Sequence, residues 1–332
     1  MNAEERERMP LVQSQRTKTM LDLCRVARKT GDHVLSMGAD DIHDTENVHG
    51  HQYSTADDVA ASALRRVISE VMPDFTSDVV EEADGRRATG RELKYPIMVC
   101  DALEGSTNTK RALASKNRGR PIFGGTSAMV LERAELSSIV ACAVYDFASK
   151  SVYSAVRTEP GSFLAFLNRE LIPQAEVQEA RGDSQWYAVV PGYSHGNVKA
   201  RCEVEEAIQA AGGRTTGGCR SSLQDLLDMV SNQVDAYVDL RALFSGGTEG
   251  SDEVLHPWDV GGALPVLDGL GFTITDENGV GWQKRCFGEP LTLIAARPSL
   301  AKKVLEAVQT LSFLNLADRG SVTLPMPPPQ IG

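Results

Sequence analysis

The chain has 332 residues, of which 42% are hydrophobic and 24% charged, a composition typical of a globular protein that can bury a sizeable core. Lys and Arg number 34 against 45 Asp and Glu, and the net charge of -11 excludes a generalised basic surface for the phosphate backbone of nucleic acid. The six cysteines are scattered without the short paired spacings of a zinc site or a disulfide framework, which favours a reducing, cytoplasmic location.

No secretory signal and no membrane span are expected from the sequence. The N-terminal stretch MNAEERERMP is charged and lacks the apolar core of a secretory signal, and no apolar run approaches the length of a membrane span. Residues 1 to about 15 are expected to be a frayed lead-in, and the tail LPMPPPQIG is too rich in proline for a helix or a central strand. No membrane partner is expected.

Two amphipathic helices are predicted near the start of the chain. Apolar residues within 20–34 recur at every third or fourth position, and a stronger stripe of the same kind runs through 59–71. The segment 38–55 between them is polar, and Pro73 is expected to end the second helix. Asp57 stands at the start of that helix, where an acid is expected as a cap or as a partner of the helix dipole.

Strands follow, and two of them end in acids. The segments 77–84 and 95–101 are predicted strands that deliver Glu81 and Asp101 at their ends. This convergence favours a metal site. Further antiparallel strands are predicted, which makes the first half α+β: 126–133, 137–146, 150–156 and 161–167.

The second half alternates strand and helix, so we expect an α/β domain to begin there. A helix follows the sequence HPWDVGG, with Asp259 at its mouth and Pro265 expected to bend it. A plain N-cap is the alternative role for Asp259. The other predicted elements are a strand at 186–190, a helix at 200–211, a glycine-rich turn, a helix at 221–230, and strands and a helix at 235–240, 291–296 and 299–311.

The stretch VCDALEGSTN, residues 99–108, places two carboxylates on one tight turn. Asp101 and Glu104 repel each other by an amount that grows as water is excluded, which suggests a cation between them. Acids before Gly-Ser are also common turn and helix N-cap residues. On this stretch alone both interpretations stay open.

Four motifs occur in a characteristic order: Asp57, VEE at 80–82, DALEGSTN at 101–108 and WDVGG at 258–262. Together they resemble the inositol monophosphatase family, within the wider fructose-1,6-bisphosphatase superfamily of magnesium-dependent, lithium-sensitive phosphatases. The resemblance implies a layered αβαβα sugar-phosphatase architecture of two domains. Residues 1–182 would form an α+β domain with an antiparallel sheet and most metal ligands, and 183–332 an α/β domain with the substrate loop and the last ligand.

The resemblance also implies a metal site. Glu81, Asp101 and the Leu103 carbonyl would hold one Mg²⁺, and Asp101 would bridge to a second that Glu104 and Asp259 also hold. Two or three Mg²⁺ ions are therefore the expected cofactor, with Mn²⁺ as a substitute, because oxygen ligands suit these hard cations.

Catalytic and phosphate-binding roles are carried over in the same way. Gly105 and Ser106 open a helix, so their N–H groups can meet phosphate oxygens. Ser106 and Asp57 match the family's hydroxyl and carboxylate pair that orients the attacking water, and Glu81 belongs to the same catalytic set.

Substrate contacts are expected from the second domain. Asp239 matches an acid that binds a substrate hydroxyl, and Gly218 and Cys219 match backbone that meets the polyol ring. Arg241, in VDLR, resembles the archaeal branch that also handles fructose 1,6-bisphosphate, where an Arg could hold a second phosphate. An exposed Arg paired with a neighbouring acid is the alternative.

The chain departs from the family pattern at several positions. Ala102 replaces the usual Pro, Val80 replaces Gly, and Glu104 replaces Asp. The segment 242–256 is longer than usual and is expected to form a lid or a partner contact.

The resulting prediction is a cytoplasmic, magnesium-dependent phosphatase that hydrolyses a small sugar or polyol phosphate, with inositol monophosphate or fructose 1,6-bisphosphate as examples. The resemblance implies a homodimer. The alternatives are a phosphatase acting on 3'-phosphoadenosine 5'-phosphate or histidinol phosphate, and a catalytically weak relative that binds phosphorylated ligands.

Overall fold

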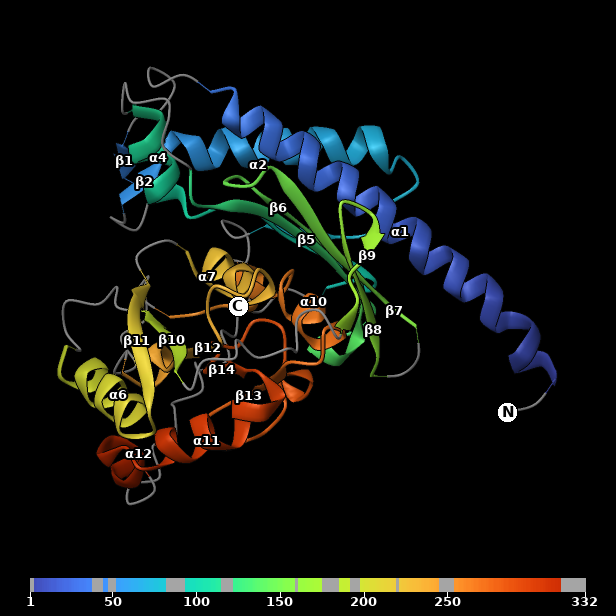
Figure 1. The fold of residues 1–332 in the computed structure, drawn as a ribbon. Helices are drawn as coiled ribbons and strands as arrows, with labels where there is room; N and C mark the ends of the chain where they lie inside the picture. The colour runs from blue at the N-terminus through green and yellow to red at the C-terminus, as the bar shows by residue number, and fades with distance from the viewer. Residues whose placement is uncertain are drawn as a thin grey trace, which may run out of the picture.

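Helices and sheets alternate in layers in the computed structural model (Figure 1), which describes residues 3–37, 44–46, 52–81, 93–114, 122–158, 161–174, 185–191, 198–218, 221–244 and 254–317. The first layer holds α1 (Ala3–Leu35) and α2 (Thr55–Val71), which pack on a seven-stranded sheet. A central layer of α7 (Ser222–Val230), α9 (Pro257–Val260) and α10 (Leu264–Gly269) separates it from a five-stranded sheet. The outer layer holds α6 (Val198–Ala210) and α11 (Pro298–Gln309). The predicted αβαβα architecture is confirmed.

The seven-stranded sheet runs in chain order from β3 to β9. β3 is parallel to β4, and the remaining neighbours are antiparallel, as predicted for this half. From β5 onward short connections account for this order, because antiparallel neighbours need only a tight turn, whereas α4 lies between β4 and β5. The strands are β3 (Val79–Glu81), β4 (Ile97–Glu104), β5 (Gly125–Leu131), β6 (Ile139–Asp146), β7 (Ser151–Arg157), β8 (Phe163–Leu167) and β9 (Glu170–Leu171).

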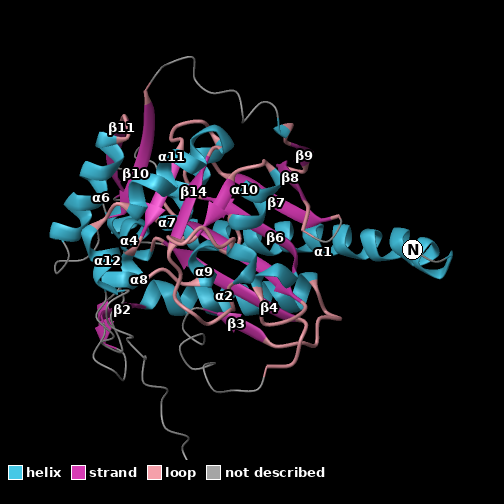
Figure 2. Cartoon of the chain, turned by 90° about the horizontal axis from the view of Figure 1, so that it is seen from below, coloured by secondary structure: helices cyan, strands magenta, loops and turns pink. Residues whose placement is uncertain are grey.

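The first helix begins earlier than the sequence indicated. α1 starts at Ala3 rather than after a frayed lead-in, and its N-terminal part extends beyond the sheet in both views (Figures 1 and 2). Glu and Arg, which dominate residues 4–8, are good helix formers that tolerate solvent on every side. The helix therefore continues where there is no sheet to cover.

The five-stranded sheet has the order β11-β10-β12-β14-β13. β10 is parallel to β11 and β12, whereas β14 is antiparallel to both of its neighbours. The strands are β10 (Trp186–Pro191), β11 (Gly213–Gly218), β12 (Ala236–Asp239), β13 (Thr273–Thr275) and β14 (Leu293–Ala296).

β11 corrects the prediction of a glycine-rich turn. Its backbone pairs along its length with β10, which satisfies the polar groups that a turn would leave to solvent. Gly213 lies against the Trp186 ring, where an added Cβ would be 2.6 Å from Cζ2, so the strand needs a residue without a side chain there.

The single bent helix predicted after HPWDVGG is two short helices. Residues 261–263 separate α9 from α10, and Pro265 lies in the first turn of α10. Proline fits this position because the first helical N–H groups have no partner within the helix. Pro265 therefore starts a helix instead of bending one.

Shorter elements complete the described chain. The β1–β2 hairpin precedes α2, α4 follows β4, α8 follows β12, and two 3₁₀ turns lie between β5 and β6 and between β13 and β14. Their bounds are β1 (Asp44–Glu46), β2 (Gln52–Ser54), α4 (Ser106–Ala114), η2 (Leu136–Ser138), α8 (Arg241–Phe244), η3 (Trp282–Lys284) and α12 (Ser312–Ala317).

Apolar side chains fill the spaces between the layers. Along β4, Ile97 and Val99 join the cluster between the two sheets, and Met98 and Cys100 join the cluster under α1 and α2. This alternation follows from the two-residue period of a strand. The cluster between the sheets contains residues from both halves of the chain, so the halves share a core. The domain division at residue 182 stays a prediction, because 175–184 lie outside the described residues.

None of the helices in the described ranges has an apolar stretch long enough to cross a membrane.

Candidate active site

Three carboxylates from distant parts of the chain converge at one end of the seven-stranded sheet. Carboxylate oxygens of Asp101, Glu104 and Asp259 lie within 4.8 Å of one another. Asp101 is 1% exposed, so its charge has little access to bulk water. Such a cluster repels itself strongly unless a cation or protons compensate it.

A β-bulge in β4 places Asp101 and Glu104 on the same side. Asp101 pairs in register with Ser127 and Glu104 with Gly125, and the register shifts between them. The Leu103 N–H donates to Asp101 Oδ1 over 2.9 Å. These contacts stabilise the predicted acidic turn from Asp101 to Glu104, in which the Leu103 side chain is buried.

The helix α7 holds Glu104. Ser221 caps this helix by accepting a bond from the Gln224 N–H. The Leu223 N–H, in the first turn of the same helix, donates to the Glu104 carboxylate. Burial raises the pKa of Glu104, and hydrogen bonds with Asp101 and Leu223 and the charge of Arg241 offset part of that effect. The extra methylene of Glu relative to Asp therefore has a structural use, since it lets the carboxylate contact a helix N-terminus.

Asp259 reaches the cluster because α9 packs closely on the sheet. The Ser127 hydroxyl donates to the Trp258 carbonyl over 3.3 Å, and the His256 N–H donates to Asp259 Oδ2 over 2.7 Å. A Cβ on Gly262 would be 2.8 Å from Val144 Cγ2, so the glycine allows this approach. Burial, and then the Glu104 charge, hold the pKa of Asp259 well above its usual range. His256, not Asp259, is therefore the N-cap of α9, and Asp259 is its third residue, whose carboxylate accepts from the N-cap backbone and also belongs to the cluster.

Glu81 lies on the strand beside Asp101. It ends β3, pairs in register with Cys100, and is buried. The group of three converging carboxylates does not include it. Burial, then the charges of Glu81 and Asp101, raise the pKa of the Cys100 thiol, which shows that both acids lie near this thiol.

The predicted phosphate-binding and water-orienting residues sit on two helix starts. Gly105, at φ +78°, turns the chain from β4 into α4, which opens with Ser106. A side chain at Gly105 would also crowd Ser221, whose Cβ would be 3.1 Å away. Asp57 lies half-buried in the first turn of α2, and α2 packs against α4.

Asp239 and Arg241 form a buried ion pair beside the carboxylates. Arg241 Nε donates to Asp239 Oδ1 over 3.0 Å, and Nη2 donates to Oδ2 over 2.6 Å. Nη2 also donates to Ser222 Oγ over 3.0 Å, which fixes the guanidinium against α7. Burial lowers the pKa of Arg241, but Asp239 more than reverses this and raises it overall. The predicted partner of Arg241 is present, although the side chain is only 12% exposed.

Two predicted substrate residues lie at the edge of what the structure describes. Gly218 is the last residue of β11, and Cys219 lies outside the described residues, as do 245–253 of the long segment after α8. The sequence analysis did not identify two groups that contact site residues: the Leu223 N–H, which donates to Glu104, and the Ser222 hydroxyl, which accepts from Arg241. The only available signal was Ser221, a typical N-cap residue before an apolar helix.

The fold has clear relatives among solved structures. The extragenic suppressor protein SuhB from Bartonella henselae is 15% identical, with 88% of this chain and 98% of that chain covered and a TM-score of 0.63. An IMPase/NADP phosphatase complexed with Mg²⁺ and phosphate is 12% identical, covering 83% and 89%, with a TM-score of 0.57. An inositol monophosphatase–fructose 1,6-bisphosphatase is 16% identical, covering 85% and 96%, with a TM-score of 0.58. Neither protein-family models nor curated proteins match the chain significantly.

The chain therefore has the fold of inositol monophosphatase structures, built around a cluster of acids at the end of β4. At these identities the shared property is the fold.

Proposed function

We propose that this chain is a magnesium-dependent phosphatase of the inositol monophosphatase family, acting on a small sugar or polyol phosphate. The convergence of Asp101, Glu104 and Asp259 carries this proposal. Stability alone does not explain three adjacent carboxylates, one buried and two partly buried, because their repulsion opposes folding. The fold likeness to phosphatases, one of them complexed with Mg²⁺ and phosphate, supports the same conclusion.

The donor set fits magnesium. Carboxylate and carbonyl oxygens are hard ligands, and Mg²⁺ binds through few carboxylates while keeping waters and substrate phosphate in its shell. Asp101, Glu104 and Asp259 would hold one ion, and Glu81 and the Leu103 carbonyl would complete a second site with Asp101. When bound, Mg²⁺ supplies a more acidic water and neutralises charge on the phosphate. Mn²⁺, which has similar ligand preferences, is expected to substitute.

The remaining residues position the reactants. The N–H groups of Gly105 and Ser106, at the start of α4, are proposed to bind phosphate oxygens. The Ser106 hydroxyl and the Asp57 carboxylate are proposed to orient the attacking water and accept its proton. Water attacks phosphorus, the ester P–O bond breaks, and the alcohol leaves with a proton from solvent.

Substrate choice is proposed to depend on the second half of the chain. Asp239 would accept a bond from a substrate hydroxyl, with Gly218 and Cys219 beside the ring. Arg241 already uses its fork on Asp239, so a distal phosphate would have to share that guanidinium. This favours a monophosphate over a bisphosphate substrate, with Arg241 orienting Asp239.

Phosphate release across a substrate panel tests the proposal. The panel contains inositol 1-phosphate, fructose 1,6-bisphosphate, histidinol phosphate, 3'-phosphoadenosine 5'-phosphate and NADP, each with Mg²⁺ and with excess chelator. We expect the fastest release from a polyol or sugar phosphate, no release with chelator, and inhibition by Li⁺. A preference for the nucleotides would show that the substrate is not a sugar or polyol phosphate. Undiminished turnover in chelator would show that the reaction needs no metal. Tight binding without turnover would identify a ligand-binding relative.

We also propose that the protein acts as a cytoplasmic homodimer, as the family resemblance implies. The cysteines at 24, 100, 142, 202 and 286 are free thiols in the structure, which suits a reducing compartment. Light scattering after size-exclusion chromatography measures the oligomeric state, and a monomeric mass would contradict the dimer.

A further inference from the structure

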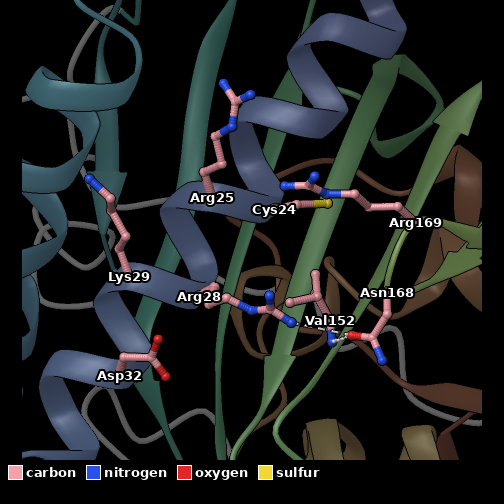
Figure 3. A pocket seen from close by; sticks show the side chains of 8 residues that line it. All are labelled: Cys24, Arg25, Arg28, Lys29, Asp32, Val152, Asn168 and Arg169. Atoms are coloured by element: carbon pink, nitrogen blue, oxygen red, sulfur yellow. Dashed lines mark hydrogen bonds between the residues drawn. The ribbon is translucent and has the colours of Figure 1, made fainter.

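A cavity of about 160 Å³ lies away from the carboxylate cluster, where α1 passes the turn between β8 and β9 (Figure 3). α1 contributes one side of the cavity, β7 contributes Val152, and the turn contributes the other side. None of its lining residues belongs to β4, α4, α7 or α9. Its lining consists of Cys24, Arg25, Arg28, Lys29, Asp32, Val152, Asn168 and Arg169.

The cavity concentrates positive charge in an acidic protein. Four of its lining residues are cationic and one is acidic, although the whole chain carries a net charge of -11. The acid, Asp32, accepts a bond from the Tyr145 hydroxyl over 2.7 Å. Arg25 is paired with Asp22, and Lys29 with Glu70.

Arg28 and Arg169 differ from the other two cations. Within the described part of the chain neither forms an ion pair with a carboxylate, and Arg28 makes only a long bond, 3.4 Å, to Asn168 Oδ1. Figure 3 shows the two side chains extending toward the cavity from opposite sides, one from α1 and one from the turn. Burial raises the pKa of the Cys24 thiol, whereas a hydrogen bond with Ser154 and then the charges of Arg169 and Arg28 lower it, so both charges act on this buried side chain.

The turn fixes the position of Arg169. Asn168 and Arg169 have φ values of +51° and +74°, the left-handed geometry of a tight two-residue hairpin. Asn168 Oδ1 accepts a bond from the Val152 N–H over 3.0 Å, which ties the turn to β7. The guanidinium of Arg169 is therefore presented from a short, anchored connection, opposite a rigid helix.

We propose that this cavity binds a small tetrahedral oxyanion of the phosphate type, held between the guanidiniums of Arg28 and Arg169. Arg28 and Arg169 are both exposed lining residues, and an anion between them is attracted by both charges. Planar, forked donors suit phosphate oxygens particularly well. The cavity volume of about 160 Å³ is several times the roughly 30 Å³ that one water occupies in the liquid, which is enough for a single phosphate group. Asp101 lies on the sheet face opposite α1, so this site is separate from the catalytic one.

Equilibrium dialysis of radiolabelled inorganic phosphate tests the proposal with the full chain in excess chelator at fixed ionic strength. Chelator removes metal from the acidic cluster, whose negative charge then disfavours phosphate. We expect one bound phosphate per chain, and a dissociation constant raised about tenfold by either Arg28→Gln or Arg169→Asn, since one charge-assisted contact is lost. Asn tolerates the left-handed turn, so this variant preserves the hairpin.

Two control variants complete the experiment. Arg133→Gln removes an exposed Arg elsewhere, whose ion pair with Glu135 is long at 3.8 Å, and should leave phosphate binding unchanged. Ser106→Ala tests the catalytic region and should also leave it unchanged. Circular dichroism confirms that every variant is folded. Absence of bound phosphate, equal loss in Arg133→Gln, or loss in Ser106→Ala alone would overturn the proposal. None of these measurements depends on turnover, so they are independent of the proposed phosphatase activity.

Discussion

Arg241 places its guanidinium fork on the carboxylate of Asp239, with contacts of 3.0 and 2.6 Å, beside the three carboxylates of the candidate active site. The pair is almost completely shielded from water, since the Asp239 side chain is 0% exposed. Burial raises the pKa values of Glu104 and Asp259, and the Arg241 charge lowers both. Arg241 is therefore a counter-charge built into the acidic site.

This relationship predicts the effect of removing the guanidinium. Arg241→Ala leaves Asp239 buried without its partner, and breaking a buried pair in this way costs about 3 kcal/mol of unfolding free energy. Urea unfolding in chelator measures the loss. The double variant Arg241→Ala with Asp239→Asn should recover part of it, because the orphaned charge is gone. A single variant as stable as the parent would mean that the pair is unimportant.

The metal assignment predicts a loss of activity without a loss of fold. Asp101→Asn and Asp259→Asn each remove a charged ligand, and turnover should fall by more than the roughly 10–100-fold typical of residues outside the ligand set. Kinetics at saturating Mg²⁺ and calorimetric Mg²⁺ titration measure both effects. Asp74→Asn, an exposed site, is the matched control. Near-parental turnover in either folded variant would place the active site elsewhere.

Glu104 predicts a distinctive pair of outcomes. Glu104→Gln keeps the length but removes the charge, and should abolish Mg²⁺-dependent turnover. Glu104→Asp keeps the charge but shortens the side chain, so it loses the Leu223 N–H and should also lower turnover. Both variants are compared with the parent on one good substrate, with Mg²⁺ affinity in parallel. A faster Glu104→Asp enzyme would show that Glu104 impairs the site.

Raised carboxyl pKa values predict how Mg²⁺ stabilisation depends on pH. Burial raises the pKa of both Glu104 and Asp259 above their values in the unfolded chain, so ionising them opposes folding. The metal-free protein therefore becomes more stable as the pH falls through those raised pKa values toward about 4, where the same groups titrate in the unfolded chain. Mg²⁺ requires the ionised forms. At a hundredfold excess over its dissociation constant it adds about 2.7 kcal/mol.

The rise in Tm caused by a fixed Mg²⁺ concentration should therefore be larger at about pH 8 than at about pH 5, where protons compete for the carboxylates. Differential scanning fluorimetry measures the rise. In Asp259→Asn the difference between the two pH values should shrink. A rise in Tm that is the same at both pH values would show that neither raised carboxyl binds the ion.

Gly262 predicts a coupling between packing and activity. In Gly262→Ala the new Cβ would press on Val144 and on Ser127, at 2.8 and 3.0 Å, so α9 must shift and carry Asp259 with it. We expect a cost of about 1–3 kcal/mol and a loss of turnover beyond what stability explains. Gly161→Ala is the control, because φ +87° strains it by a similar amount at a place with open space. Equal turnover in the two variants would contradict the coupling.

The local elements were largely predictable from the sequence. The alternation along β4 and the helical stripe of α2 are short-range patterns, since strand and helix periods decide which residues share a face. The acids at the ends of β3 and β4 were visible for the same reason. β11 was missed because its glycine-rich sequence has no such period, and only pairing with β10 makes it a strand.

The relationships between distant residues were decided by the tertiary structure. The sequence alone determined which oxygen-bearing residues the chain offers, including Asp101, Glu104 and Asp259, and the resemblance grouped them. Their approach to within 4.8 Å depends on the packing of α9 against β5 and on the position of α7. Whether Arg241 is free or paired was equally undecided by the sequence. Side-chain charge is a local property, whereas burial and partner choice follow from which layers the whole chain brings together.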